Sequence, residues 1–169
     1  MAPSKLSNFI ASAEVQADVE QAFTRHEFTL DFNDTKAGYL ASIPTTSSVY
    51  FVAGERDGQV LSLYVGKATD LRRRIRDYHR AFQVHCPNDR KLAFFQSWLP
   101  TIEPGWELTL RSTSVHAPEL SACEADWIHR LAPMVNATAP ADDAARANVE
   151  RASGEYFRSW FARRLAAGD

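Results

Sequence analysis

A carboxylate stands inside an apolar helix face at Glu124. The segment from Pro118 to Leu131 is expected to form a helix, because proline favours the first helical turn and a second proline follows the segment. At about 100° per residue, Glu124 falls about 40° from Leu120, in the middle of the stripe that includes Trp127. An unpaired buried charge is costly, so this carboxylate must meet a cation, accept strong hydrogen bonds or line a cleft. A structural ion pair with an arginine and a functional site are both open readings at this point.

Basic residues gather in one part of the chain. Between residues 67 and 91 the local charge is +5, although the whole chain carries −2. The eight basic residues there are Lys67, Arg72, Arg73, Arg74, Arg76, Arg80, Arg90 and Lys91. Guanidinium groups suit phosphate because they donate two parallel hydrogen bonds to it, although a charge run is also commonly a solvated helix face.

These arginines lie on a short amphipathic helix that begins after Thr69 or Asp70, either of which can cap it. Its apolar residues recur at helical spacing, namely Leu71, Ile75, Tyr78 and Phe82. Arg74 and Tyr78 project together at the edge of this apolar stripe, while the other arginines point elsewhere. Arg74 is therefore the candidate to grip a reacting phosphate.

Two tyrosines belong to an expected antiparallel hairpin just before this helix. The runs SVYFVA and QVLSLYVG alternate with a period of two around the loop GERDG. Alternation puts Val49, Phe51 and Ala53 on one face, matched by Leu61, Leu63 and Val65. Tyr50 and Tyr64 would then share the opposite face as direct or diagonal neighbours.

In this order the motifs resemble the GIY-YIG nuclease family. Ser48-Val49-Tyr50 stands at the GIY position, Tyr64-Val65-Gly66 at the YIG position, and Arg74 follows Gly66 by eight residues. Glu124 matches the family's metal-binding glutamate, and Asn136 follows it by twelve residues. Ser48 departs from the usual glycine, and Tyr78 stands where members carry histidine or tyrosine. The similarity extends over about residues 48–136.

The resemblance implies an α+β fold with a small three-stranded antiparallel sheet flanked by helices. It also implies hydrolysis of DNA phosphodiester bonds with Mg²⁺ or Mn²⁺ as cofactor, the ion being held mainly by Glu124. Magnesium binds through one or two carboxylates plus phosphate and water, so one glutamate suffices. Tyr50 is the candidate general base and Tyr64 would orient water or phosphate, with the reverse assignment open.

Further site residues follow from this interpretation. Lys67, Arg74 and the metal would have to lower the pKa of a tyrosine base, because its ordinary value is about 10. Tyr78 joins the catalytic set beside Arg74. Gly66 and Asn136 would brace the site. The predicted DNA-contacting residues are Arg72, Arg73, Arg76, His79 and Arg80. The histidines show no zinc-ligand spacing and are read as surface or partly buried.

The remaining chain is expected to form one domain over residues 1–169, with the catalytic core at 48–136. Residues 1–47 form a helical extension, with a helix at 7–25 and a possible strand at 27–31, and residues 139–169 form a helical tail. A second helix at 91–99 and a strand at 106–113 complete the prediction. The amphipathic ends could close the core or support a homodimer.

Composition excludes several classes of protein. With 169 residues, 45% hydrophobic residues, 7 glycines and 8 prolines, the chain is neither disordered nor collagen-like. Neither a signal peptide nor a run of about 18 apolar residues is present, so the expected location is the cytoplasm, without a membrane partner. The alternative functions are a binding module for DNA or protein that has lost catalysis, and a nuclease acting on RNA.

Overall fold

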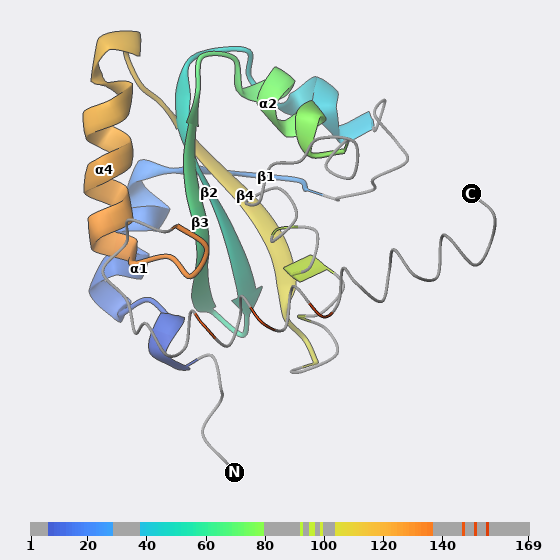
Figure 1. Cartoon of the computed structure of the whole chain (residues 1–169), viewed down its shortest axis with the longest axis vertical. Coiled ribbons are helices and arrows are strands. Elements are labelled where there is room, and N and C mark those ends of the chain that lie inside the picture. Colours follow the sequence, from blue (N-terminus) through green and yellow to red (C-terminus); the bar gives the residue numbers. More distant parts are fainter. Residues whose placement is uncertain are drawn as a thin grey trace, which may run out of the picture.

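The computed structural model describes residues 7–28, 38–79 and 104–136, and in addition Leu92, Phe95, Gln96, Leu99, Ala147, Arg151 and Glu155. Within these residues the chain is α+β: one antiparallel sheet of four strands, in the order β1-β4-β2-β3, packs against three α-helices (Figure 1). The predicted class is therefore confirmed, whereas the predicted number of three strands is wrong.

The central hairpin consists of β2 (Ser48–Arg56) and β3 (Gln59–Ala68). The two strands are joined by Asp57 and Gly58, both with positive φ (49° and 76°). An Asp-Gly pair suits this two-residue turn because both central positions require the left-handed region. The hairpin predicted from the alternation is confirmed, with a shorter loop than GERDG.

A β-bulge between Val52 and Ala53 divides this hairpin into two registers. On one side of the bulge Val52 pairs with Tyr64, and on the other Ala53 pairs with Ser62. Because of the bulge, the side chains of Leu61 and Leu63 pack on the same face of the sheet as Tyr50. The prediction that these leucines share a face with Val49 and Phe51 is therefore wrong, because strict alternation does not survive an extra residue.

The fourth strand is β1 (Thr24–His26), which pairs with β4 (Glu107–Ser114). The sequence placed a short strand slightly later, at residues 27–31, and a helix over the whole of 7–25. The structure has a 3-10 turn, η1 (Ser7–Phe9), then α1 (Ala13–Ala22), and β1 directly afterwards. The predicted N-terminal helical extension thus also contributes a strand to the sheet.

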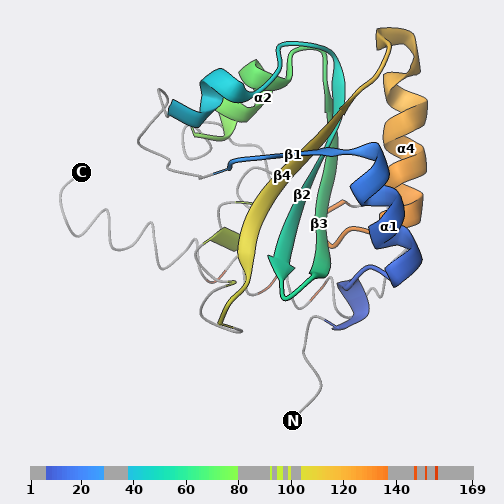
Figure 2. The same cartoon turned by 180° about the vertical axis from the view of Figure 1, so that it is seen from behind.

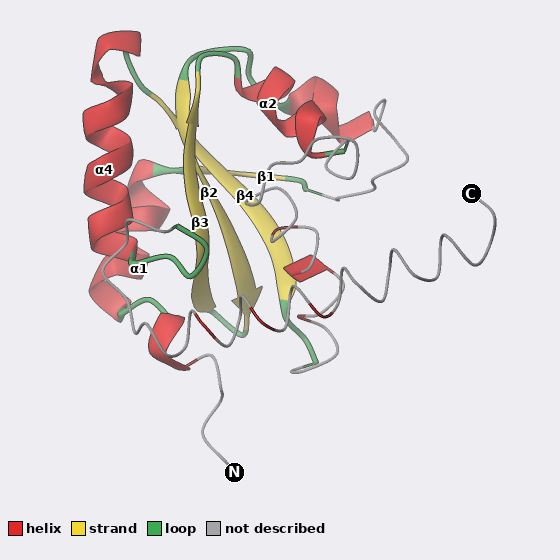
Figure 3. Cartoon of the chain, viewed as in Figure 1, coloured by secondary structure: helices red, strands yellow, loops and turns green. Residues whose placement is uncertain are grey.

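Helices cover both faces of the sheet (Figures 2 and 3). On one face α1 and α4 (Leu120–Leu131) pack side by side, with the rings of Phe23 and Trp127 in edge contact at 4.8 Å. On the other face lie α2 (Leu71–Tyr78) and the 3-10 turn η2 (Gly38–Ser42). The Asp70 carboxylate accepts a 2.9 Å hydrogen bond from the Arg73 amide, which confirms Asp70 as the α2 cap.

The outer edge of β3 is covered by chain from two other regions. Ile10 bridges Leu61, and the amides of Met134 and Val135 donate to carbonyls of β3. Asn136 continues this edge through its side chain. Because an open strand edge invites pairing with another chain, this covering protects the strand that carries Tyr64.

Other predicted elements are only partly inside the described residues. Leu92, Phe95, Gln96 and Leu99 are helical, in agreement with the helix expected at 91–99, and Ala147, Arg151 and Glu155 are helical in the tail. The rest of those two segments lies outside the described residues. The helices that are described are too short or too polar to cross a bilayer.

Candidate functional site

Three tyrosines and an arginine form a buried cluster between the hairpin and α2. Tyr50 and Tyr64 share one face, as predicted, and of the two predicted arrangements the structure has the diagonal one, with ring centroids 6.0 Å apart. The Tyr50 and Tyr78 hydroxyls are hydrogen-bonded at 2.6 Å, and Arg74 Nε donates to the Tyr50 hydroxyl at 3.2 Å. The Arg74 guanidinium also lies 4.4 Å above the Tyr78 ring, which the four-residue spacing on α2 allows.

Gly66 makes room for this cluster. It pairs with Tyr50 across the hairpin, and a Cβ atom at residue 66 would approach the Tyr50 Cζ and hydroxyl oxygen to 2.5 Å and Tyr64 Cε1 to 2.9 Å. Any larger residue would therefore displace the Tyr50 ring. The bracing role predicted for Gly66 thus has a steric basis.

The pKa values of Tyr50 and Tyr78 are governed by burial. Burial raises the pKa of Tyr50, and the neighbouring Tyr64 raises it further, while Arg74 and the hydrogen bonds with Tyr78 and Arg74 lower it only in part. Burial likewise raises the pKa of Tyr78. The sequence argument required cations to lower the pKa of a tyrosine base, and in the resting protein burial outweighs that effect.

Glu124 of α4 forms an ion pair with Lys67 of β3, on the face of the sheet that α4 covers. Its carboxylate Oε2 lies 2.8 Å from Lys67 Nζ, and the same ammonium group donates to Ser121 Oγ at 3.1 Å. The side chain of Glu124 is 20% exposed, although its neighbours on the stripe are buried. The cation that meets the carboxylate is thus a lysine of β3 rather than an arginine.

An open pocket of about 580 Å³ lies at the end of β3, and its lining includes neither Glu124 nor Tyr50, Tyr64 or Tyr78. It lies between the first turns of α2 and α4 and is lined by Lys67, Arg73, Arg74, Asp77 and Ser121, among others. Lys67 contacts Glu124 and Arg74 contacts Tyr50. The pocket therefore has one lining cation from each half of the predicted site.

The donor set allows a divalent ion with few protein ligands. Within the described residues no three side chains of His, Cys, Asp or Glu converge as a metal cage. Glu124 is a half-buried carboxylate that already binds one cation, the Lys67 ammonium. These residues fit Mg²⁺ or Mn²⁺ held through one carboxylate, with the other oxygen ligands from substrate and water.

The predicted DNA-contacting residues divide into several environments. Arg73 and Arg76 are exposed on α2, and Arg73 lines the pocket. Arg72 instead donates to the carbonyls of Ile43 (2.8 Å) and Ala41 (2.9 Å), so that its guanidinium fastens α2 to η2. Arg80 lies outside the described residues.

His79 is fully buried, so its reading as a surface or partly buried residue is wrong. Its Nε2 atom is 2.6 Å from the Tyr39 hydroxyl, which provides a polar partner in the interior. Burial of the ring at the end of α2 follows from packing against η2, a contact that local spacing does not reveal. In this conformation His79 has no surface from which to contact DNA.

Asn136 holds the strand of Tyr64 in place. Its Oδ1 accepts from the Val65 amide at 2.9 Å, and its Nδ2 donates to the Val65 carbonyl at 2.8 Å. The carboxamide thereby replaces one residue of a neighbouring strand, next to Gly66. The structure gives Asn136 a bracing contact of the kind that the sequence suggested.

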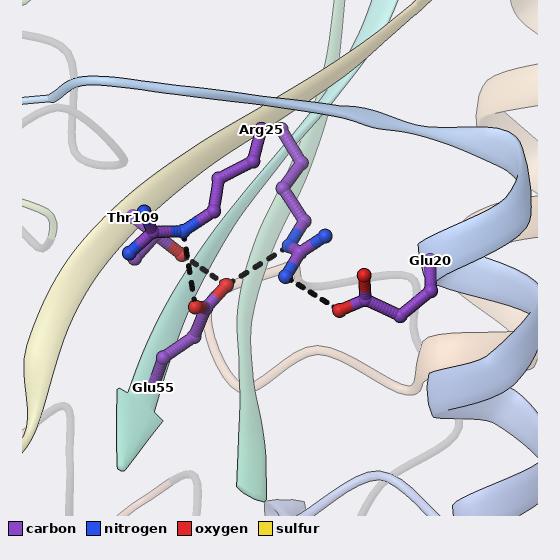
Figure 4. Close-up of polar contacts among 5 residues, drawn as sticks. Glu20, Arg25, Glu55 and Thr109 are labelled. Carbon is purple, nitrogen blue, oxygen red and sulfur yellow. Dashed lines mark hydrogen bonds and ion pairs between the residues drawn. The ribbon is translucent and has the colours of Figure 1, made fainter. Parts of the chain in front are cut away.

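A second polar cluster lies toward the opposite end of the sheet (Figure 4). Arg111 of β4 is 6% exposed and donates to Glu55 Oε1 at 2.9 Å and to Glu20 Oε1 at 2.8 Å. Glu55 also accepts from Thr109 at 2.8 Å and from Arg25 at 3.2 Å. The cluster ties α1, β1, β2 and β4 together.

Sequence reasoning missed several of these contacts. Ser121 lies three residues before Glu124, a helical spacing that marks it as a neighbour. Arg111 falls in the polar phase of the alternating run WELTLRST, so alternation alone predicts an exposed side chain there. Tyr39 carried no comparable signal.

Comparison with known proteins finds no matching family model, no matching curated protein and no matching solved structure.

Proposed function

We propose that this protein is a divalent-metal-dependent endonuclease that hydrolyses DNA phosphodiester bonds by a GIY-YIG-type mechanism. The observation that carries the proposal is the pocket between α2 and α4, which is lined by Lys67 and Arg74. These two cations contact the carboxylate of Glu124 and the hydroxyl of Tyr50 respectively. A phosphate in the pocket would meet positive charge beside both a candidate base and a candidate metal ligand.

In this proposal the protein's residues bind, orient and move protons. Arg74 binds the scissile phosphate and stabilises the negative charge that develops on it. Tyr50 first releases its own proton to solvent, and the resulting phenolate takes a proton from the attacking water. Tyr78 holds the Tyr50 oxygen in place through their hydrogen bond, and Tyr64 orients the water. The cleavage rates of Tyr50→Phe and Tyr64→Phe decide which of the two tyrosines takes the proton, because loss of the base should have the larger effect.

Glu124 would hold Mg²⁺ or Mn²⁺, which supplies charge stabilisation of the leaving oxygen. The protein contributes a half-buried carboxylate on a rigid helix for this purpose. Lys67 approaches the same carboxylate from β3, and so must move or share the carboxylate when an ion binds.

A binding module without catalysis is the second candidate. The observation that favours it is the resting state itself, because Glu124 is paired with Lys67 and burial raises the pKa of Tyr50. Such a module would bind DNA through Arg73 and Arg76 and leave it intact. The same assay separates the two candidates.

The test is nicking of a supercoiled plasmid by the full chain, with Mg²⁺ or with EDTA. Wild type should cut in Mg²⁺ and not in EDTA, and Glu124→Ala should not cut. The folded state of Glu124→Ala should change by less than about 1 kcal/mol, because the lost ion pair is partly exposed. Asp126→Ala, an exposed carboxylate on the same helix, is the matched control and should cut like wild type.

Three results would contradict the proposal. Cutting by Glu124→Ala at the wild-type rate would remove the metal assignment. Binding of DNA by wild type without any cutting in Mg²⁺ or Mn²⁺ would favour the binding module. Cleavage of an RNA duplex but not of DNA would change the substrate class.

A further inference from the structure

The ammonium group of Lys67 bridges two residues on the first turns of α4. It lies 2.8 Å from Glu124 Oε2 and 3.1 Å from Ser121 Oγ. Lys67 extends from β3, and its side chain is 40% exposed whereas that of Glu124 is 20% exposed. The lysine is therefore the more exposed partner of the ion pair.

A cation in this position competes with any other cation for Glu124. A divalent ion at the carboxylate would be repelled by the ammonium group unless Lys67 moved away. Lysine is suited to such a movement, because its charge is compact and its four-carbon stem is flexible. Lys67 also lines the pocket, so an anion there attracts the same ammonium group.

We propose that Lys67 is a substrate-operated counter-ion that keeps Glu124 closed to divalent ions until a DNA phosphate enters the pocket. In the DNA-free protein Lys67 neutralises the carboxylate and weakens ion binding. A phosphate between α2 and α4 draws Lys67 away, and the carboxylate becomes available. This inference rests on the proposed function, in which Glu124 takes the ion and the pocket takes the phosphate.

The consequence is positive coupling between DNA and the divalent ion that passes through Lys67. Thermodynamic linkage requires that DNA tighten ion binding by the same factor by which the ion tightens DNA binding. Some coupling is expected at any metal site that shares a phosphate ligand. The part due to Lys67 is distinguished by its loss when the lysine is replaced.

The first test measures Mn²⁺ binding to the DNA-free full chain by electron paramagnetic resonance. Lys67→Met should tighten binding by about three- to tenfold, as expected when one partly exposed ion pair and one repulsion are removed. Arg73→Met is the matched control, because this exposed arginine lines the same pocket but is not a partner of the Glu124 ion pair. It should leave Mn²⁺ affinity within about twofold of wild type.

The second test repeats the titration with a short DNA duplex in proteins that also carry Tyr50→Phe, so that the duplex is not cut during the measurement, and a gel of the same samples checks that it stays intact. The duplex should tighten Mn²⁺ binding by a larger factor when Lys67 is present than in the protein with Lys67→Met. An equal factor in both proteins would overturn the proposal, as would an Arg73→Met effect as large as that of Lys67→Met.

Glu124→Gln separates this inference from the proposed function. If it abolishes Mn²⁺ binding while Lys67→Met binds like wild type, the counter-ion role is wrong and the metal assignment stands. If Glu124→Gln binds Mn²⁺ like wild type, both are wrong. Circular dichroism of each variant establishes that the fold is retained.

Discussion

The two ends of β2 carry buried polar clusters of different chemistry. Near the end of the strand, Glu55 meets Arg111, which is also paired with Glu20, so that guanidinium and carboxylate groups neutralise one another. Near its beginning, Tyr50 meets Arg74, and the arginine donates to the Tyr50 hydroxyl. The first cluster pairs opposite charges, whereas the second places a cation beside a phenol, whose ordinary pKa is about 10.

The comparison also concerns the pKa values. Burial of Glu55 by itself raises the pKa of its carboxyl, but hydrogen bonds from Thr109 and Arg111 and the charges of Arg111 and Arg25 lower it overall. At Tyr50 burial dominates and the pKa is raised. The hydrogen bonds and charges around Glu55 therefore outweigh its burial, whereas at Tyr50 burial outweighs the hydrogen bonds and the charge of Arg74.

The largest expected effect is at the tyrosine cluster. Tyr50→Phe should reduce DNA cleavage by at least about 100-fold, the lower range for loss of a general base, and leave the free energy of unfolding nearly unchanged. Because the pKa of Tyr50 is raised, the wild-type rate should rise with pH up to at least about 9. Single-turnover rates over this pH range provide the measurement.

Tyr39→Phe is the control, since it loses a tyrosine hydroxyl that bonds to His79 on the same side of the sheet. Its rate should resemble that of wild type. Equal rates for Tyr50→Phe and Tyr39→Phe at every pH would show that the Tyr50 hydroxyl takes no part in the chemistry.

A smaller effect, on stability and not on cleavage, is expected at the cluster of Arg111, Glu55 and Glu20. Arg111→Met leaves Glu55 and Glu20 without their buried cation, and should destabilise the fold by about 2 to 4 kcal/mol in urea unfolding. Arg25→Met is the control: its side chain is 55% exposed, so its loss should cost less than about 1 kcal/mol. Folded Arg111→Met should cut DNA at the wild-type rate.

The pH dependence of folding stability is a second test of the pair of Glu55 and Arg111. Because the pKa of Glu55 is lowered in the folded protein, its stabilising contribution is present above the unfolded pKa of about 4.3 and is lost as pH falls through the folded pKa. Arg111→Met should lose part of this acid sensitivity. A variant as stable as wild type at neutral pH and equally acid-sensitive would show that the pair contributes nothing to the fold.

The smallest effect is expected on α2. Arg72→Gln removes the hydrogen bonds to the carbonyls of Ala41 in η2 and of Ile43 just after it. It should lower stability by about 1 to 2 kcal/mol, with an unchanged salt dependence of DNA binding. The control Arg76→Gln changes an exposed arginine and should lower the slope of log affinity against log salt by about 0.9 if it contacts a phosphate. Binding titrations at several salt concentrations test both variants. A lowered slope of log affinity against log salt in Arg72→Gln would show that Arg72 contacts DNA.

The sequence by itself determined the elements that depend on neighbouring residues. The hairpin followed from alternation around the loop GERDG, and α2 followed from helical spacing after a cap at Thr69 or Asp70. Helical spacing also predicted α4 and placed Glu124 on its apolar face. Tyr50 and Tyr64, predicted as direct or diagonal neighbours, share a face because the β-bulge between Val52 and Ala53 shifts the pairing register between the turn and Tyr50. Each of these inferences uses interactions within a few residues or across one turn.

The tertiary structure decided what distant segments do to one another. The three residues of β1 are too few for a period of two to be visible, and only pairing with β4 makes them a strand. The bulge beside Val52 redirected two leucines, packing against η2 buried His79, and the approach of β3 to α4 made Lys67 the partner of Glu124. None of these could be read locally, because a side chain's partner is fixed by the packing of whole elements and not by its own position in the chain.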